Sequence, residues 1–165
     1  MYYQGITRLA VSGKINDRNI KGEAWLDHQW GNMAAGTSGL WDWMSVQMNN
    51  NEELMLYRVR TPEGKVVQTI GSIIDQHGEA RAATDLVMEP KRTWKSETGR
   101  EYILSWTAKA KEFDLEINAV RDQQELNSTS TNIAYWEGPI RVNGQWKGNA
   151  GQGTGMMELV SGLLK

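Results

Sequence analysis

About ten short segments of this chain alternate apolar and polar residues, and that pattern constrains its fold more than any other feature. A period of two places successive side chains on opposite faces of a strand. Turn residues separate the segments at intervals typical of an antiparallel meander. No stretch keeps a period of 3.6 residues over three turns, and only residues 120–130 fit a short helix as well as a strand followed by a loop. The segments expected to form strands are residues 6–13, 22–30, 40–48, 53–60, 65–75, 84–90, 101–110, 113–120, 132–144 and 155–162.

A sheet of this size without helices to cover it must form a sandwich or close on itself, and closure removes the exposed edges that promote aggregation. We therefore expect an all-β fold, an antiparallel β-barrel of about eight to ten strands. The chain has eight Trp but one Phe, and 17 Gly but 3 Pro. Such a composition suits a curved sheet, in which glycines permit bends and indoles fill a wide interior. A length of 165 residues is expected to form a single domain, residues 1–165.

Charge and composition exclude several classes of function. The formal net charge is -2 at pH 7 and the pI is about 5.7, so no basic surplus attracts nucleic acid or an anionic membrane. The absence of cysteine excludes disulfides, cysteine-ligated zinc and thiol catalysis, and two histidines far apart do not form a metal-binding motif. We expect no metal, no cofactor and no membrane span, hence a soluble chain. The compartment stays open, because a parent protein exported to the periplasm or secreted is compatible with this sequence.

The stretch "GEAWLDHQWGN" places a carboxylate, an imidazole and two indoles within one expected strand. Neighbouring strand residues point to opposite faces, so Asp27 and His28 do not form a dyad by themselves. His28 is a candidate for proton transfer, although a histidine between apolar neighbours also commonly hydrogen-bonds a carbonyl and stays neutral. One face would carry Leu26, His28 and Trp30, and the other would carry Trp25, Asp27 and Gln29.

Asp42 lies between Trp41 and Trp43, which is a second carboxylate in an aromatic setting. In a dry pocket its pKa would rise, and the protonated acid could donate a proton to an alkene while an indole stabilises the resulting cation. Alternatively Asp42 caps a turn, or pairs with Arg58 or Arg60 across a hairpin. Alternation alone does not show which face of this strand is the inner one.

Several further polar and aromatic positions could line a cavity, and each could equally be structural. Glu137 precedes a Gly-Pro pair and could simply close a strand. These further positions are Tyr57, Gln124, Tyr135, Trp136 and Glu137.

A set of motifs spans nearly all 165 residues in a fixed order: "YYQGITRLAVSG", "GEAWLDHQWGN", "GLWDWMSVQM", "ELMLYRVR", "RTWKSETGREYILSW", "QQEL" and "YWEG". With these motifs the chain resembles the carboxy-terminal lipocalin-like domain of the AttH and carotenoid 1,2-hydratase (CrtC) family. The resemblance implies a calycin-type β-barrel, usually the second of two in one polypeptide and often exported. It also implies an activity like those of the family's members. These include hydratases that add water to terminal isoprenoid double bonds, related terpene cyclases and fungal cycloaddition enzymes.

The resemblance assigns His28 and Trp30 to a box that looks like part of the hydratases' active region, and Tyr57 to the strand after it. The hydratases are expected to carry an acidic proton donor two residues beyond that tyrosine, where this chain has Val59. Asp42 or Asp27 would then have to replace that donor. The other barrel of the family would have to come from a second lipocalin-like domain or from a homodimer, unless this chain acts by itself.

We predict a lipocalin-like domain that binds a small hydrophobic ligand, isoprenoid or polyketide-like, in a Trp-lined barrel pocket. The alternative is a cofactor-independent hydratase or cyclase of the carotenoid 1,2-hydratase type, which acts by acid-initiated chemistry at a C=C bond. The candidate catalytic residues are Asp42, His28, Tyr57 and Asp27. The candidate ligand-binding residues are Trp30, Trp41, Trp43, Tyr135, Trp136, Glu137 and Gln124.

Overall fold

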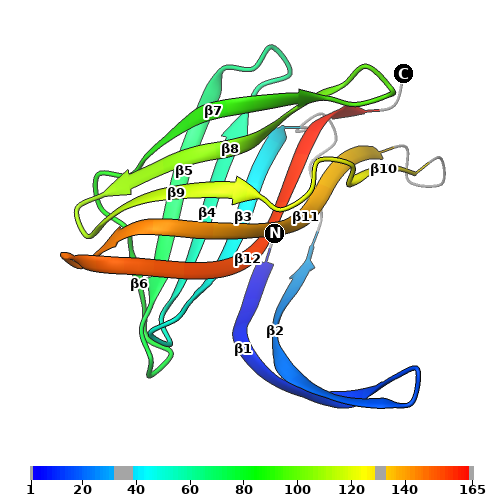
Figure 1. Ribbon diagram of the computed structural model, residues 1–165. Helices are drawn as coiled ribbons and strands as arrows, with labels where there is room; N and C mark the ends of the chain where they lie inside the picture. Colours follow the sequence, from blue (N-terminus) through cyan, green and yellow to red (C-terminus); the bar gives the residue numbers. More distant parts are fainter. Residues whose placement is uncertain (1, 32–38, 129–132, 164–165) are drawn as a thin grey trace. The chain divides into compact units, whose positions relative to one another are not determined.

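The computed structural model describes residues 2–31, 39–128 and 133–163, and in these ranges the chain forms strands and turns but no helix. Within them, accordingly, there is no helix with the length and apolar character needed to cross a bilayer. The chain divides into two compact units, Met1–Thr37 and Ser38–Lys165, each described here by itself (Figure 1). The all-β expectation is confirmed, whereas the single-domain organisation stays a prediction.

The first unit is a long β-hairpin. Strand β1 (Tyr2–Ile15) pairs antiparallel with β2 (Arg18–Trp30), and Ile15 lies opposite Arg18. The two residues between the strands, Asn16 and Asp17, have φ angles of 46° and 64°. Positive φ at both central positions is the requirement of a type I′ turn, whose twist matches that of the flanking strands, and Asn and Asp tolerate it well.

The second unit is one curled antiparallel sheet. The hydrogen-bonded order is β6-β5-β4-β3-β12-β11-β9-β8-β7, and β10 pairs with β11 beside this path. The end strands β6 and β7 are joined only by residues 83–86, which can span at most roughly 18 Å. The sheet therefore curls so that its two ends approach each other, as in a lipocalin-like half-barrel. Its strands are β3 (Leu40–Met48), β4 (Glu53–Arg60), β5 (Val66–Ile74), β6 (Ala80–Ala82), β7 (Val87–Lys95), β8 (Glu101–Ala110), β9 (Phe113–Ala119), β10 (Glu125–Ser128), β11 (Ile133–Trp146) and β12 (Asn149–Leu163).

Two local details differ from the sequence-based expectation. The segment expected at 84–90 is strand β7, which continues to Lys95, with irregular pairing at Pro90 and Arg92. Proline has no backbone N–H to donate to the hydrogen bonds of a sheet. Pro90 therefore looks like the end of a strand in the sequence, although β7 continues beyond it. The ambiguous stretch at 120–130 contains the short strand β10 and no helix among its described residues.

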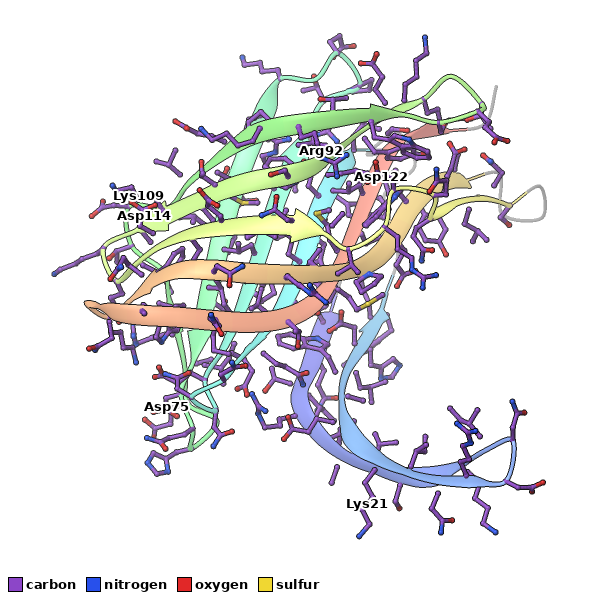
Figure 2. The ribbon with its side chains drawn as sticks, in the orientation of Figure 1. Lys21, Asp75, Arg92, Lys109, Asp114 and Asp122 are labelled. Carbon is purple, nitrogen blue, oxygen red and sulfur yellow. The ribbon has the colours of Figure 1, made fainter. Side chains whose placement is uncertain are left out.

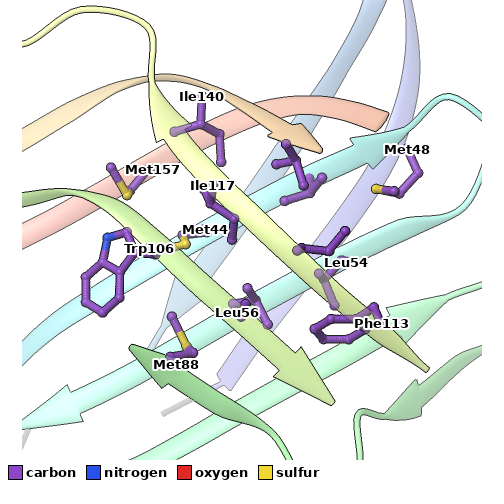
Figure 3. Close-up of a cluster of buried hydrophobic side chains, with 14 of the residues drawn as sticks. Met44, Met48, Leu54, Leu56, Met88, Trp106, Phe113, Ile117, Ile140 and Met157 are labelled. Atoms are coloured by element: carbon purple, nitrogen blue, oxygen red, sulfur yellow. The ribbon is translucent and has the colours of Figure 1, made fainter. Parts of the chain in front are cut away.

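The hydrophobic core lies on one face of the curled sheet (Figure 3). Alternate residues of almost every strand reach it, as period-two alternation requires. Three indoles, Trp106, Trp136 and Trp146, belong to this core. Its other buried members include Met44, Leu54, Leu56, Leu104, Leu115, Ile117, Ile140 and Met157.

Exposed ion pairs lie on and beside strands β7, β8 and β9 (Figure 2). Arg92 donates two hydrogen bonds of 2.9 Å to the carboxylate of Asp122, which ties β7 to the segment after β9. Lys109 pairs with Asp114 at 2.9 Å across the β8–β9 turn. Solvent screens such pairs, so each contributes roughly 0–1 kcal/mol to stability.

Candidate functional site

Five strands place one residue each in a single row on the face of the sheet opposite the core. From β5 to β11 the row reads Ile70, Tyr57, Trp43, Glu158 and Glu137, each directly opposite the next. Trp41 and Tyr135 stand two residues from Trp43 and Glu137, hence on the same face. We call Trp41, Trp43, Tyr57, Tyr135, Glu137 and Glu158 the outer strip. All are half-buried except Glu137, which is exposed.

Glu158 occupies the middle of the outer strip. The indole Nε1 of Trp41 donates a hydrogen bond of 2.6 Å to its carboxylate. On one side Glu158 lies opposite Trp43 and on the other opposite Glu137. Two carboxylates directly opposite each other across a ladder repel. The strip therefore concentrates negative charge among aromatic rings.

The two tyrosines of the outer strip are held in their neutral form. Burial raises the pKa of Tyr57, and the charge of Glu158 raises it further. Burial likewise raises the pKa of Tyr135, with Glu137 and Glu158 adding to the effect. A phenol whose pKa lies above its usual value of about 10 keeps its proton at neutral pH. Both hydroxyls can therefore donate hydrogen bonds to a ligand.

Asp42 points to the opposite face, into the core, and is 2% exposed. Its carboxylate accepts hydrogen bonds from Arg58 Nε at 2.8 Å, and from Arg60 Nε and Nη2 at 2.9 and 3.0 Å. The guanidinium of Arg58 also lies 4.3 Å from the ring centre of Trp106, across the interior. The alternative in which Asp42 pairs with Arg58 or Arg60 across the hairpin is confirmed, and both arginines take part. Both carboxylate oxygens are already bound by guanidinium groups and face away from the outer strip.

In the first unit, the side chains of Asp27 and His28 lie on opposite faces of strand β2, as the alternation predicts. Asp27 accepts hydrogen bonds from Tyr3 Oη at 2.5 Å and from Trp25 Nε1 at 2.6 Å. The imidazole of His28 instead contacts the ring of Trp30, with centroids 4.7 Å apart. The hairpin thus carries a hydrogen-bonded carboxylate on one face and a histidine–indole contact on the other.

The candidate ligand-binding tryptophans do not share one face of the sheet. Trp41 and Trp43, whose face alternation left open, lie on the face opposite the core. Trp136 does face the core, where it is 0% exposed and donates a hydrogen bond of 2.6 Å to the carbonyl of Asp122. Gln124 donates a weak hydrogen bond of 3.4 Å to the carbonyl of Glu137. The fully packed indoles of the core are Trp106, Trp136 and Trp146, and the partly buried Trp94 packs against this core.

Sequence reasoning missed Glu158. It lies in the expected strand 155–162, but its place in the site depends on the pairing of β12 with β3, which is far away in sequence. Its only local signal is a carboxylate in an otherwise apolar segment, "GMMELVSG". Among the residues that the structure describes, no three metal-ligating side chains gather into a possible metal site.

Comparisons with known proteins match almost the whole of this chain. The family model described as AttH-like matches residues 1–162. Kievitone hydratase from Fusarium solani subsp. phaseoli is 28% identical over 96% of this chain and 49% of its own length. A crystal structure of an AttH candidate from Nitrosomonas europaea is 29% identical with a TM-score of 0.82, covering 97% of this chain and 52% of that one. The crystal structure of kievitone hydratase from Nectria haematococca, 24% identical with a TM-score of 0.76, covers 96% and 52% and shows the likeness of fold. The chain thus spans about half the length of these relatives.

Proposed function

The chain belongs to the AttH-like family, and from this premise we propose that it binds a small hydrophobic ligand, isoprenoid or polyketide-like, on the outer strip. The observation that carries the proposal is the row that joins Tyr57, Trp43 and Glu158 across three adjacent strands. The strip replaces the barrel interior as the proposed site, because the interior indoles are packed core residues.

The outer strip combines apolar contact area with a few polar groups, which is the usual make-up of a small-molecule site. Two half-buried indoles, Trp41 and Trp43, offer flat surfaces that gain by leaving water. The neutral phenols of Tyr57 and Tyr135 supply hydrogen-bond donors, and Glu137 and Glu158 supply acceptors. A ligand with an apolar body and a few hydroxyl or carbonyl groups fits this arrangement.

Replacing Trp43 with alanine should weaken binding of such a ligand by roughly ten-fold, because it removes the indole at the centre of the row. The measurement is calorimetric titration of the purified chain with farnesol, which has an isoprenoid body and one hydroxyl. Val87→Ala is the matched control, since Val87 is a 53% exposed apolar residue on β7, outside the outer strip. Equal affinities for the Trp43→Ala variant and the wild-type chain would reject the outer strip as the site.

A second candidate function, hydration of an alkene, is favoured by the carboxyl group of Glu158 among these rings. The relative from Fusarium is named a hydratase. In its protonated form Glu158 would give its proton to one alkene carbon, with the π electrons forming the new C–H bond. The cation left on the other carbon would be attacked by water, and the resulting oxonium would return a proton to the carboxylate. We assign this role to Glu158 instead of Asp42, whose oxygens bind Arg58 and Arg60 in the core.

Hydration in heavy water should place one carbon-bound deuterium in the alcohol formed from an isoprenoid alkene, because the proton donor exchanges with solvent. The product is analysed by mass spectrometry after incubation with the purified chain. We expect Glu158→Gln to abolish product formation, since an amide cannot donate a proton in this step. Turnover that persists in Glu158→Gln would exclude Glu158, and binding without turnover would leave the chain a binding module.

This chain matches only about half of its relatives' length, and the other half of those proteins suggests a partner for this chain. We propose that a second lipocalin-like barrel, in the same polypeptide or in a second copy of this chain, accompanies the unit described here. Export of the parent protein to the periplasm or beyond stays a prediction.

A further inference from the structure

We propose that one face of the β1–β2 hairpin is the surface through which two copies of this chain associate. The inference rests on the partner proposed above, because it commits to a second copy of the chain and names the surface that receives it. It concerns the first unit alone and is independent of the ligand site on the outer strip.

The hairpin has one apolar and one polar face. Residues that lie opposite each other across the two strands share a face, and so do alternate residues along each strand. Eight large apolar side chains of the hairpin are exposed, and seven of them share one face, whereas the eighth, Tyr3, lies on the other. We call the side that carries these seven the apolar face, and they are Tyr2, Ile6, Val11, Ile15, Ile20, Leu26 and Trp30.

The two faces differ in charge as well as in hydrophobicity. The polar face carries Lys14, Lys21, Glu23 and Asp27, whereas Arg18 is the one residue with a fixed charge among the described residues of the apolar face. A ribbon of two strands has no second layer of its own, and an isolated hairpin is marginally stable in water. A contiguous exposed apolar face usually marks a site of association. The apolar face therefore calls for a partner.

The order of residues makes the apolar face complementary to itself. Seven pairs of facing residues run from Tyr2–Trp30 at the open end of the hairpin to Ile15–Arg18 at the turn, and Leu9–Ala24 is the middle pair. A two-fold axis that crosses the ribbon at this middle pair stacks β1 on β1 and β2 on β2, with the ends of the two hairpins reversed. Both copies then bury the same surface, as in most symmetric dimers.

Larger side chains near the open end meet glycines near the turn in this arrangement. Leu26 of one copy lies over Gly22 of the other, because both residues are two positions from Ala24 on β2. Gln4 lies over Gly13 by the same count of pairs on β1. A Cβ atom at Gly13 or at Gly22 would have no other atom within 4 Å, so the space over both glycines is open. The turn half of the face thus has room for the larger residues of a second copy.

Charge favours the same reversed arrangement. Tyr2 and Trp30 stack at the open end of the apolar face, with ring centroids 5.6 Å apart, and Arg18 is exposed at the turn. Reversing the ends places each Arg18 over the Trp30 ring of the other copy, and the face of an indole attracts a guanidinium. A two-fold axis along the ribbon would instead bring both arginines to the same end, where they repel each other.

The oligomeric state of the intact chain tests this inference, measured by sedimentation equilibrium at concentrations up to about 100 µM. We expect the mass to rise with concentration from 18.6 kDa towards twice that value. Val11→Glu should weaken association at least roughly hundred-fold, because each copy then carries a charge into the interface. Ser12→Glu is the matched control, since Ser12 is the next residue along β1, equally exposed but on the polar face, and it should leave association unchanged.

Further variants test how the two hairpins are arranged. Gly22→Val occupies the open space over Gly22 and should weaken association roughly ten-fold, although valine itself suits a strand. Arg18→Glu should weaken it by about as much, since it removes the cation from the ring of Trp30. A short bismaleimide should crosslink Ala24→Cys into a dimer but not Ser12→Cys, and the chain has no cysteine of its own to interfere. Unchanged association in both Gly22→Val and Arg18→Glu would overturn the reversed arrangement.

The outcomes separate this inference from the ligand proposal. A chain that stays monomeric at the highest concentration, or a dimer that responds equally to Val11→Glu and Ser12→Glu, overturns the inference. The apolar face would then belong to a different occupant, such as a second barrel in a longer polypeptide or a membrane surface. Farnesol is titrated into the same samples: a monomer that binds it overturns only the dimer, and a dimer that does not bind it overturns only the ligand site. Circular dichroism of each variant confirms that it is folded.

Discussion

Replacing Asp42 with alanine is expected to lower the free energy of unfolding by about 3–5 kcal/mol. The carboxylate is 2% exposed and neutralises one of two guanidinium groups that reach into the core from β4. Without it, Arg58 and Arg60 would face each other in a poorly solvated site with no anion between them. Urea unfolding followed by circular dichroism measures the change in the midpoint, and the slope should stay constant.

A surface carboxylate provides the control for this experiment. Asp114 pairs with Lys109 at a comparable distance of 2.9 Å, but both side chains are more than half exposed. Asp114→Ala should therefore cost no more than about 1 kcal/mol. If Asp42→Ala cost as little as Asp114→Ala, the buried ion cluster would not be a structural element of the barrel.

Replacing Trp136 with alanine should cost about 3–5 kcal/mol, the range observed for large aromatic residues removed from a core. The indole is 0% exposed, and its Nε1 donates to the carbonyl of Asp122. Gly138 packs directly on the ring, where even a Cβ atom would come within 2.7 Å of it. Truncation would leave a cavity and remove one of the two hydrogen bonds to the Asp122 carbonyl, which also accepts from the backbone N–H of Gln124.

Trp43→Ala is the informative comparison, because that indole is half-buried on the outer strip. We expect it to cost clearly less stability than Trp136→Ala while weakening ligand binding more strongly in the folded protein. Thermal unfolding and ligand titration of the two variants measure both quantities. Reversed effects, with Trp136 governing affinity at little cost in stability, would place the ligand in the interior.

The fold class followed from alternation because each strand has one buried face, and a long sheet without helices must curl to bury it. The pairing of Asp42 with arginines could also be predicted, since the turn between β3 and β4 brings position 42 opposite position 58. In the hairpin, alternation likewise placed Asp27 and His28 on opposite faces. These features depend on neighbours close in sequence.

The orientation of β3 could not be predicted by the same reasoning. On this strand and on β4, the inner face carries Asp42, Arg58 and Arg60, whereas the outer face carries Trp41 and Trp43. At these positions the usual rule that apolar residues lie inside would turn the indoles inwards, although further along the two strands Met44, Val46, Leu54 and Leu56 do lie inside as the rule expects. The ion pairs of Asp42 with Arg58 and Arg60 make the observed arrangement possible, and they depend on three residues together.

Glu158 was missed for a different reason, the length of chain between its strand and β3. No turn fixes the pairing of β12 with β3, so the register follows only from the folded sheet. Gly155 allows the close approach, because a Cβ atom there would lie 1.8 Å from the carbonyl oxygen of Ser45. The carboxylate of Glu158 is therefore placed in the site by β12, a strand interrupted by glycines.

Photoaffinity labelling tests most directly whether the ligand binds on the outer strip or in the interior. A diazirine analogue of farnesol is crosslinked to the intact chain, and labelled residues are identified by mass spectrometry with excess farnesol as competitor. Our account predicts competed labels on outer-strip residues of β3, β4, β11 and β12, such as Trp43 and Tyr57. Competed labels on Ile117 or Leu115, which reach the core from β9, would contradict it.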